Sequence, residues 1–86
     1  MKKVWILYRY FLDLRTLEEE VGWWINKKEE GAKKGFESEL EEYYEQYGEH
    51  RKEDCSIYQI EEGVVYLEVP GEHRFLLVYQ EEPVFN

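Results

Sequence analysis

The chain has 86 residues, with 20 acidic side chains, 11 basic ones and a net charge of -9. Its length accommodates a single small domain, residues 1–86, and it has neither an apolar run of the roughly 20 residues that span a bilayer nor a signal-peptide cleavage site. Its 43% apolar and 17% aromatic content excludes a disordered chain, and its negative charge argues against direct binding to nucleic-acid phosphates.

Residues 4–12 predict the first element, a β-strand rich in β-branched and aromatic side chains. Val4, Ile6, Tyr8 and Tyr10 alternate with Trp5, Leu7, Arg9 and Phe11. Because neither set is polar, we expect a central strand that is covered on much of both faces. The start of a buried helix is the alternative interpretation.

Residues 14–28 predict an amphipathic helix with Asp13 as its N-cap. Leu14, Leu17, Val21, Trp24, Ile25 and Lys28 recur at spacings of three and four. Acidic residues precede basic ones along this segment, which complements a helix macrodipole. Trp23 lies off the apolar stripe.

A second helix is expected from about Phe36 to Tyr47, after a break marked by Gly31 and Gly35. Ser38 and Glu41 fit a capping box at its start, and Gly48 is a natural stop. One face of this helix carries Phe36, Leu40, Tyr43, Tyr44 and Tyr47.

The last third of the chain predicts three strands, over residues 56–61, 64–69 and 74–80. Gly63 and Pro70-Gly71 provide the turns, the second of type II, while Pro83 is expected to end the ladder before a short tail over residues 84–86. The predicted fold is therefore α+β, a single small domain of order β-α-α-β-β-β with one antiparallel sheet covered by helices on one face.

Charge divides unevenly along the chain. Residues 1–35 hold 8 basic and 6 acidic side chains, whereas residues 36–86 hold 3 basic and 14 acidic ones. The second half therefore carries the entire negative excess, and any charge-directed function is expected there.

The predicted partner-binding site combines the acidic second helix with exposed aromatic anchors. Its residues are Glu37, Glu41, Glu42, Glu45, Glu49, Tyr43, Tyr44, Tyr47 and Trp23. Carboxylates at helical spacing approximate a row of phosphates, and Tyr and Trp are favoured at protein interfaces. The competing interpretation is a solvated surface that only keeps the protein soluble.

The sequence contains no phosphate-binding loop, dinucleotide fingerprint or zinc-protease motif. Cys55 has no histidine at a fixed local spacing and is interpreted as a small hydrophobic residue. His50 lies near Glu53, Asp54 and Cys55, an arrangement that we interpret as solvated rather than metal-binding. We therefore predict no enzymatic activity, no cofactor and no metal site.

The leading hypothesis is a non-enzymatic, cytoplasmic protein-binding module that docks on a basic protein surface. In its sharpest form, it is an inhibitor of viral or mobile-element origin that mimics nucleic acid and blocks the basic groove of a host nucleic-acid-binding or defence complex. The alternative is a homodimeric structural or subunit protein of a thermophile, since Glu and Lys are abundant and amides are few.

Overall fold

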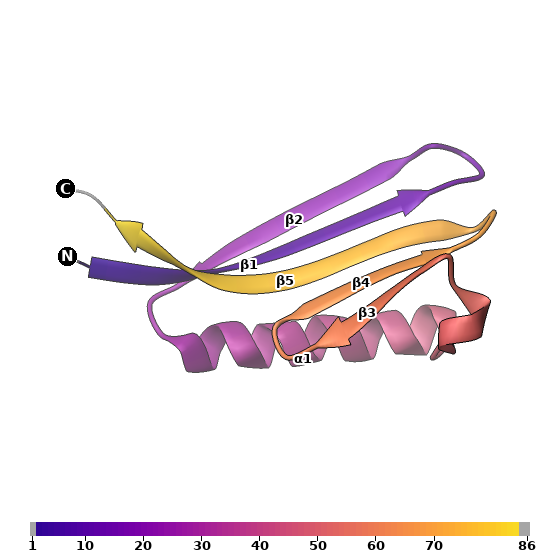
Figure 1. Ribbon diagram of the computed structural model, residues 1–86. Coiled ribbons are helices and arrows are strands. Elements are labelled where there is room, and N and C mark those ends of the chain that lie inside the picture. Colours follow the sequence, from indigo (N-terminus) through magenta and orange to yellow (C-terminus); the bar gives the residue numbers. More distant parts are fainter. Residues whose placement is uncertain (1, 85–86) are drawn as a thin grey trace.

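The computed structural model describes residues 2–84. It consists of one antiparallel sheet of five strands and one long helix (Figure 1). In chain order the elements are β1 (Lys2–Asp13), β2 (Glu19–Asn26), α1 (Glu29–Tyr47), the 3-10 turn η1 (Lys52–Asp54), β3 (Ile57–Glu61), β4 (Val64–Val69) and β5 (His73–Val84). The sheet has the strand order β2-β1-β5-β4-β3. The α+β class and the antiparallel sheet are confirmed, but the element order is β-β-α-β-β-β.

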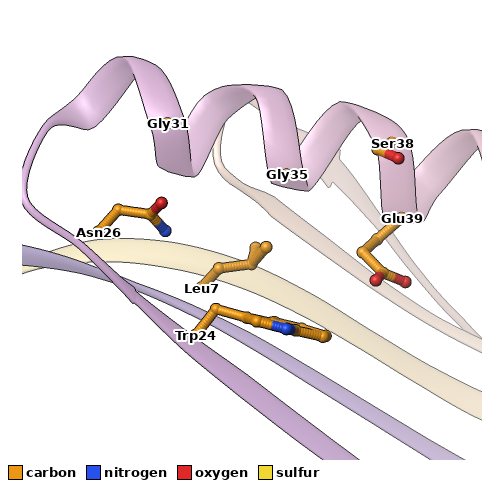
Figure 2. A pocket seen from close by; sticks show the side chains of 7 residues that line it. All are labelled: Leu7, Trp24, Asn26, Gly31, Gly35, Ser38 and Glu39. Atoms are coloured by element: carbon orange, nitrogen blue, oxygen red, sulfur yellow. The ribbon is translucent and has the colours of Figure 1, made fainter.

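The helix α1 begins at Glu29, well before the predicted start, and its cap residue Lys28 makes no side-chain capping bond. The predicted capping box is wrong because Ser38 lies in the middle of this helix. Gly31 and Gly35 do not break the helix; they bring it close to the sheet, since a Cβ on Gly35 would lie 2.8 Å from Leu7 Cδ2 (Figure 2). Among residues 2–84, no helix has the length and apolar character needed to cross a membrane.

The C-terminal end of α1 follows the sequence prediction. Gly48 has a φ of 82°, and its backbone N–H donates to the carbonyl of Tyr44 at 2.8 Å. A residue without a Cβ is favoured where the chain leaves a helix with positive φ.

The helix predicted over residues 14–28 is wrong, because residues 19–26 form the edge strand β2. The pattern in this segment also fits a two-residue period, with Val21, Trp23 and Ile25 on one side. Pairing with β1 selects that period, as in the opposed residues Tyr8 and Trp23. Aromatic and β-branched cross-strand pairs stabilise such a hairpin.

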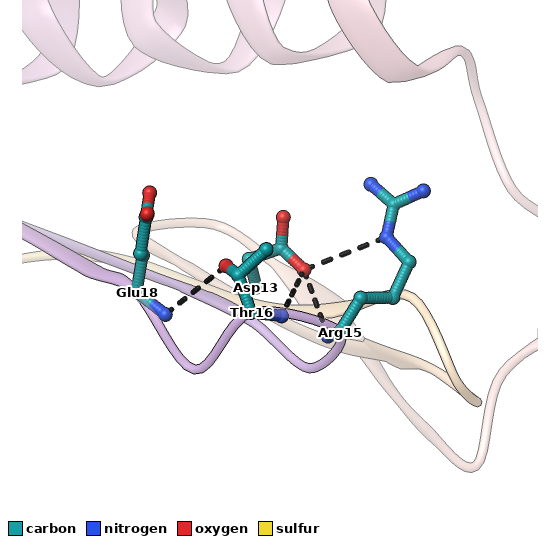
Figure 3. Close-up of polar contacts among 4 residues, drawn as sticks. All are labelled: Asp13, Arg15, Thr16 and Glu18. Atoms are coloured by element: carbon teal, nitrogen blue, oxygen red, sulfur yellow. Dashed lines mark hydrogen bonds and ion pairs between the residues drawn. The ribbon is translucent and has the colours of Figure 1, made fainter.

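Asp13 is a capping residue, but it caps the β1–β2 turn and not a helix (Figure 3). Its Oδ1 accepts hydrogen bonds from the backbone N–H groups of Arg15 at 2.8 Å and Thr16 at 3.3 Å. Leu17 completes the turn with a φ of 64°. The same local bonds begin a helix or close a turn, so Asp13 alone does not distinguish the two.

The three C-terminal strands are confirmed within a few residues, and the positive φ values of Gly63 (82°) and Gly71 (75°) supply the predicted turns. The prediction that Pro83 ends the ladder is wrong, since β5 pairs with β1 as far as Val84. Proline is tolerated there because β4 pairs with β5 only up to Val78, which leaves that side of β5 free. Of the predicted tail, Phe85 and Asn86 lie outside the described residues.

The hydrophobic core lies between α1 and one face of the sheet. It is made of buried side chains from the helix and the three inner strands, namely Leu7, Phe11, Phe36, Tyr43, Val65, Leu67, Phe75 and Leu77. The strand β1 is interior, as predicted, but the helix covers only the face with Leu7 and Phe11. The expected cover on the face with Tyr8 and Tyr10 is absent from the described part of the chain, and both side chains are half-buried.

Candidate protein-binding surfaces

The outer side of α1 carries a row of exposed carboxylates. We name this row the acidic face, and it consists of Glu37, Glu41, Glu42 and Glu45, with Glu49 just beyond the helix. None of the five takes part in an ion pair within residues 2–84. The helix lysines pair elsewhere, Lys34 with Glu30 at 3.6 Å and Lys33 with Glu62 at 3.2 Å. The acidic face is thus left without an internal counter-charge.

The position of the acidic face opposes the helix macrodipole. Glu41, Glu42 and Glu45 occupy the C-terminal half of α1, and its last turn contains no basic residue. Carbonyl groups make that end partially negative, so a carboxylate there lowers helix stability, as do like charges four residues apart, such as Glu41 and Glu45. These charges therefore do not serve the stability of the helix that carries them.

The three predicted tyrosine anchors differ in accessibility. Tyr43 is only 1% exposed, so it is a core residue and is not available to a partner. Tyr44 is half-buried, and the pKa of its hydroxyl is raised by burial and by the neighbouring charge of Glu49. Tyr47 is 38% exposed in the last turn of α1, and its ring packs towards the sheet, with centroid separations of 5.1 Å from Phe11 and 4.8 Å from His73. Tyr47 is consequently the most accessible aromatic side chain of the three.

The structure does not place Trp23 with the acidic helix. Trp23 lies on β2, paired with Tyr8, on the face of the sheet opposite to α1. Its neighbour Trp24 points to the helix side, where it lines a pocket with Leu7 (Figure 2). The predicted site therefore divides into two surfaces on opposite sides of the molecule.

The second surface is the helix-free side of the sheet, which we name the open face. Its apolar side chains come from all five strands: Ile6, Tyr8, Tyr10 and Leu12 from β1, Val21, Trp23 and Ile25 from β2, Ile57 from β3, Val64 and Tyr66 from β4, and Leu76 and Val78 from β5. Strand alternation places them together, because their neighbours in sequence form the core beneath α1. This surface was not predicted from the sequence, because residues 14–28 were expected to form a helix and residues 19–26 form β2 instead.

A pocket of about 200 Å³ lies between α1 and the first hairpin (Figure 2). Its floor is formed by Leu7 and Trp24, and its walls include the carboxylate of Glu39 and the hydroxyl of Ser38. Ligand pockets are ordinarily 300–1,000 Å³, so this one suits a single side chain better than a small-molecule substrate.

A buried polar pair, which the sequence did not reveal, connects α1 to β5. His73 is 4% exposed, and a hydrogen bond of 2.7 Å joins its Nε2 to the hydroxyl of Tyr43. The ring also stacks on Phe11 at 5.1 Å and lies 5.9 Å from the ring of His50. Burial, and then the proximity of His50, lower the pKa of His73 below its ordinary value.

The lowered pKa of His73 predicts a loss of stability in mild acid. As pH falls below about 6.5, the unfolded chain takes up a proton on His73 before the folded chain does, so the free energy of unfolding decreases until the folded-state pKa is passed. We expect the urea midpoint to be lower at about pH 5 than at about pH 7. The variant His73→Gln should show a smaller difference between the two conditions; an unchanged difference would assign the effect to other groups.

The described residues offer little support for a catalytic or metal-binding site. Cys55 is half-buried against the core, and burial raises the pKa of its thiol, which disfavours a reactive thiolate at neutral pH. Across residues 2–84, no cluster of three or more His, Cys, Asp or Glu side chains could hold a metal ion. Comparison with family models, curated proteins and solved structures found no match.

Proposed function

We propose that this protein is a non-enzymatic binding module whose acidic face docks on a basic surface of a partner protein. The observation that supports this most directly is the row of carboxylates on α1 that no basic side chain of the described chain neutralises. A basic partner would supply the missing counter-charges and accelerate association by electrostatic steering.

The position of these charges favours a binding role over simple solubility. Carboxylates would serve solubility equally well at any exposed position, but here Glu45 occupies the last turn of α1, where a negative charge is least favourable, and Glu41 lies four residues before it. Residues that lower stability without a structural benefit are typical of functional surfaces.

The sharper form of the proposal is that the acidic face imitates nucleic acid. The four acidic-face glutamates within α1, from Glu37 to Glu45, span eight residue steps, or about 12 Å of helix at 1.5 Å per residue, which gives a mean separation of roughly 4 Å between charges. One strand of DNA presents a charge about every 3.4 Å along its axis. The partner would then be a nucleic-acid-binding enzyme or a defence complex. The present protein would be an inhibitor of that partner, encoded by a virus or a mobile element.

Tyr47 is the proposed apolar anchor of this interface. Charge alone gives rapid association, whereas a desolvated aromatic side chain slows dissociation. Its ring is 38% exposed in the last turn of α1, the turn that also carries Glu45.

Neutralising three carboxylates tests the proposal. In the variant Glu41→Gln/Glu42→Gln/Glu45→Gln, we expect partner binding to be lost while the free energy of unfolding rises by about 1 kcal/mol, since charges that oppose the macrodipole and each other are removed. Binding is measured by capture from host lysate at low salt with a salt-step elution, and stability by urea unfolding. Because the variant is expected to be more stable, loss of binding could not be attributed to unfolding.

The matched control carries the same change of charge away from α1, as Glu18→Gln/Glu61→Gln/Glu72→Gln, three exposed carboxylates without ion pairs in the described structure. It should retain the captured partner. Release of that partner by duplex DNA would support mimicry specifically. Identical capture by the wild type and both variants would contradict the proposal.

A further inference from the structure

We infer that the open face is the interface between two copies of this chain, which pack sheet against sheet. This inference concerns the side of the molecule opposite to the acidic face and does not depend on the proposed function. It rests on the exposure, the extent and the charge of the open face.

The exposure of β2 is the first observation. Val21, Trp23 and Ile25 are 56%, 59% and 59% exposed, and all three lie on the open face. Isolated exposed apolar residues are ordinary, but three successive outward positions of one strand, beside half-buried Tyr8 and Tyr10, form a continuous patch. Since apolar groups gain free energy when removed from water, this patch favours association.

The extent of the open face meets the requirement of a stable dimer. Five strands spaced about 4.8 Å apart give a width of about 24 Å, and the eight residues of β2 at about 3.3 Å each give a length of about 26 Å. The product is on the order of 600 Å² per copy, or about 1,200 Å² for two copies, which reaches the lower limit of specific protein interfaces. Two sheets that pack in this way share a core about 10 Å thick.

The charges of the open face select a second copy over a basic partner. Its interior is uncharged, and near one end Arg74 forms an ion pair with Glu68 on the adjacent strand. The other carboxylates on this face, Glu19, Glu61 and Glu82, lie at its rim. A basic protein surface would therefore find no counter-charges at the centre of the patch, whereas two identical apolar patches are complementary under two-fold symmetry. The unneutralised carboxylates of α1 lie on the far side of each sheet, so they would point outward from both copies and would not repel across the interface.

The experiment is light scattering coupled to size-exclusion chromatography over a range of protein concentrations. The wild-type chain, of mass 10.6 kDa, should elute with twice that mass. The variant Trp23→Lys places a charge on the open face and should elute with the single-chain mass while retaining its circular dichroism spectrum. If this variant does not fold, Val21→Lys, at an equally exposed position, makes the same test.

The matched control is Ile60→Lys. Ile60 is 41% exposed on the other edge strand, β3, but it lies on the helix side of the sheet, opposite Val65. This control should keep the doubled mass. A wild type of single-chain mass up to its solubility limit would overturn the inference, as would a doubled mass in folded Trp23→Lys. Loss of the dimer in both variants would assign the contact to strand edges and would also overturn it.

The same experiment separates this inference from the proposed function. Neutralising Glu41, Glu42 and Glu45 should leave the doubled mass intact, because these residues lie away from the open face. A monomeric wild type that binds a single-stranded oligonucleotide would identify the open face as a base-stacking surface and would contradict the dimer.

Discussion

Replacing Phe75 by alanine is expected to lower the free energy of unfolding by about 3–5 kcal/mol, the largest effect of any single substitution considered. Phe75 is fully buried, and its ring stacks on Tyr43 at 4.1 Å with an interplanar angle of 10°. The Arg9 guanidinium carbon lies over the Phe75 ring, 5.5 Å from the ring centroid. Removing the ring therefore removes a fully buried aromatic contact between α1 and β5.

The measurement is urea unfolding at one fixed protein concentration, because self-association would make the midpoint concentration-dependent. Ile60→Ala is the control, since this side chain is exposed at the sheet edge, and its cost should stay below about 1 kcal/mol. Domains of this kind have total stabilities of about 5–15 kcal/mol, so the loss at Phe75 is a large share of the whole. If Phe75→Ala and Ile60→Ala lowered the free energy of unfolding equally, the core would not lie between α1 and β5.

The second large effect is expected at Tyr43, where replacement by phenylalanine should cost about 1–3 kcal/mol. The substitution keeps the aromatic stacking but leaves Nε2 of buried His73 without its hydrogen-bond partner. A buried polar atom that loses its partner retains the full cost of leaving water. Thermal and urea unfolding both report this loss.

Tyr44→Phe is the matched control for this prediction. Tyr44 is the next residue of the same helix and is half-buried, and within residues 2–84 its hydroxyl makes no hydrogen bond to another side chain. We expect its replacement to change stability by less than about 0.5 kcal/mol. A Tyr43→Phe variant as stable as Tyr44→Phe would mean that the bond to His73 contributes nothing to the fold.

The parts of the fold that were predicted correctly are those specified by neighbouring residues. The turns at Gly63 and Gly71 require a positive φ, which glycine adopts without strain, and they determine how β3, β4 and β5 follow one another. Gly48 ends α1 for the same local reason. None of these assignments depends on residues distant in the chain.

The segment over residues 19–26 could not be assigned from local pattern because it satisfies two periods at once. Val21, Trp24 and Ile25 fit a helix, while Val21, Trp23 and Ile25 fit a strand. The choice depends on β1, whose edge is available for pairing in the folded sheet. A signal favouring the strand was nevertheless present, since Gly22 lowers helix propensity by about 1 kcal/mol.

The two candidate surfaces also differ in whether neighbouring residues alone could predict them. The carboxylates of α1 were found from helical spacing alone, which is local information. The open face depends on which side of β1 the helix covers, and that choice follows from packing of Leu7 and Phe11 against α1. The pairing of Tyr43 with His73 joins positions 30 residues apart and likewise has no local signature.

The central claim is that the unneutralised carboxylates of α1 bind a basic protein surface, and the salt dependence of that binding tests it most directly. The affinity of the captured partner for the wild-type protein, measured by isothermal titration from low to high ionic strength, should fall by at least about tenfold, because exposed charges are screened by salt. The Glu41→Gln/Glu42→Gln/Glu45→Gln variant should show weaker binding and a shallower dependence. An affinity that stays constant across the same salt range would contradict the claim.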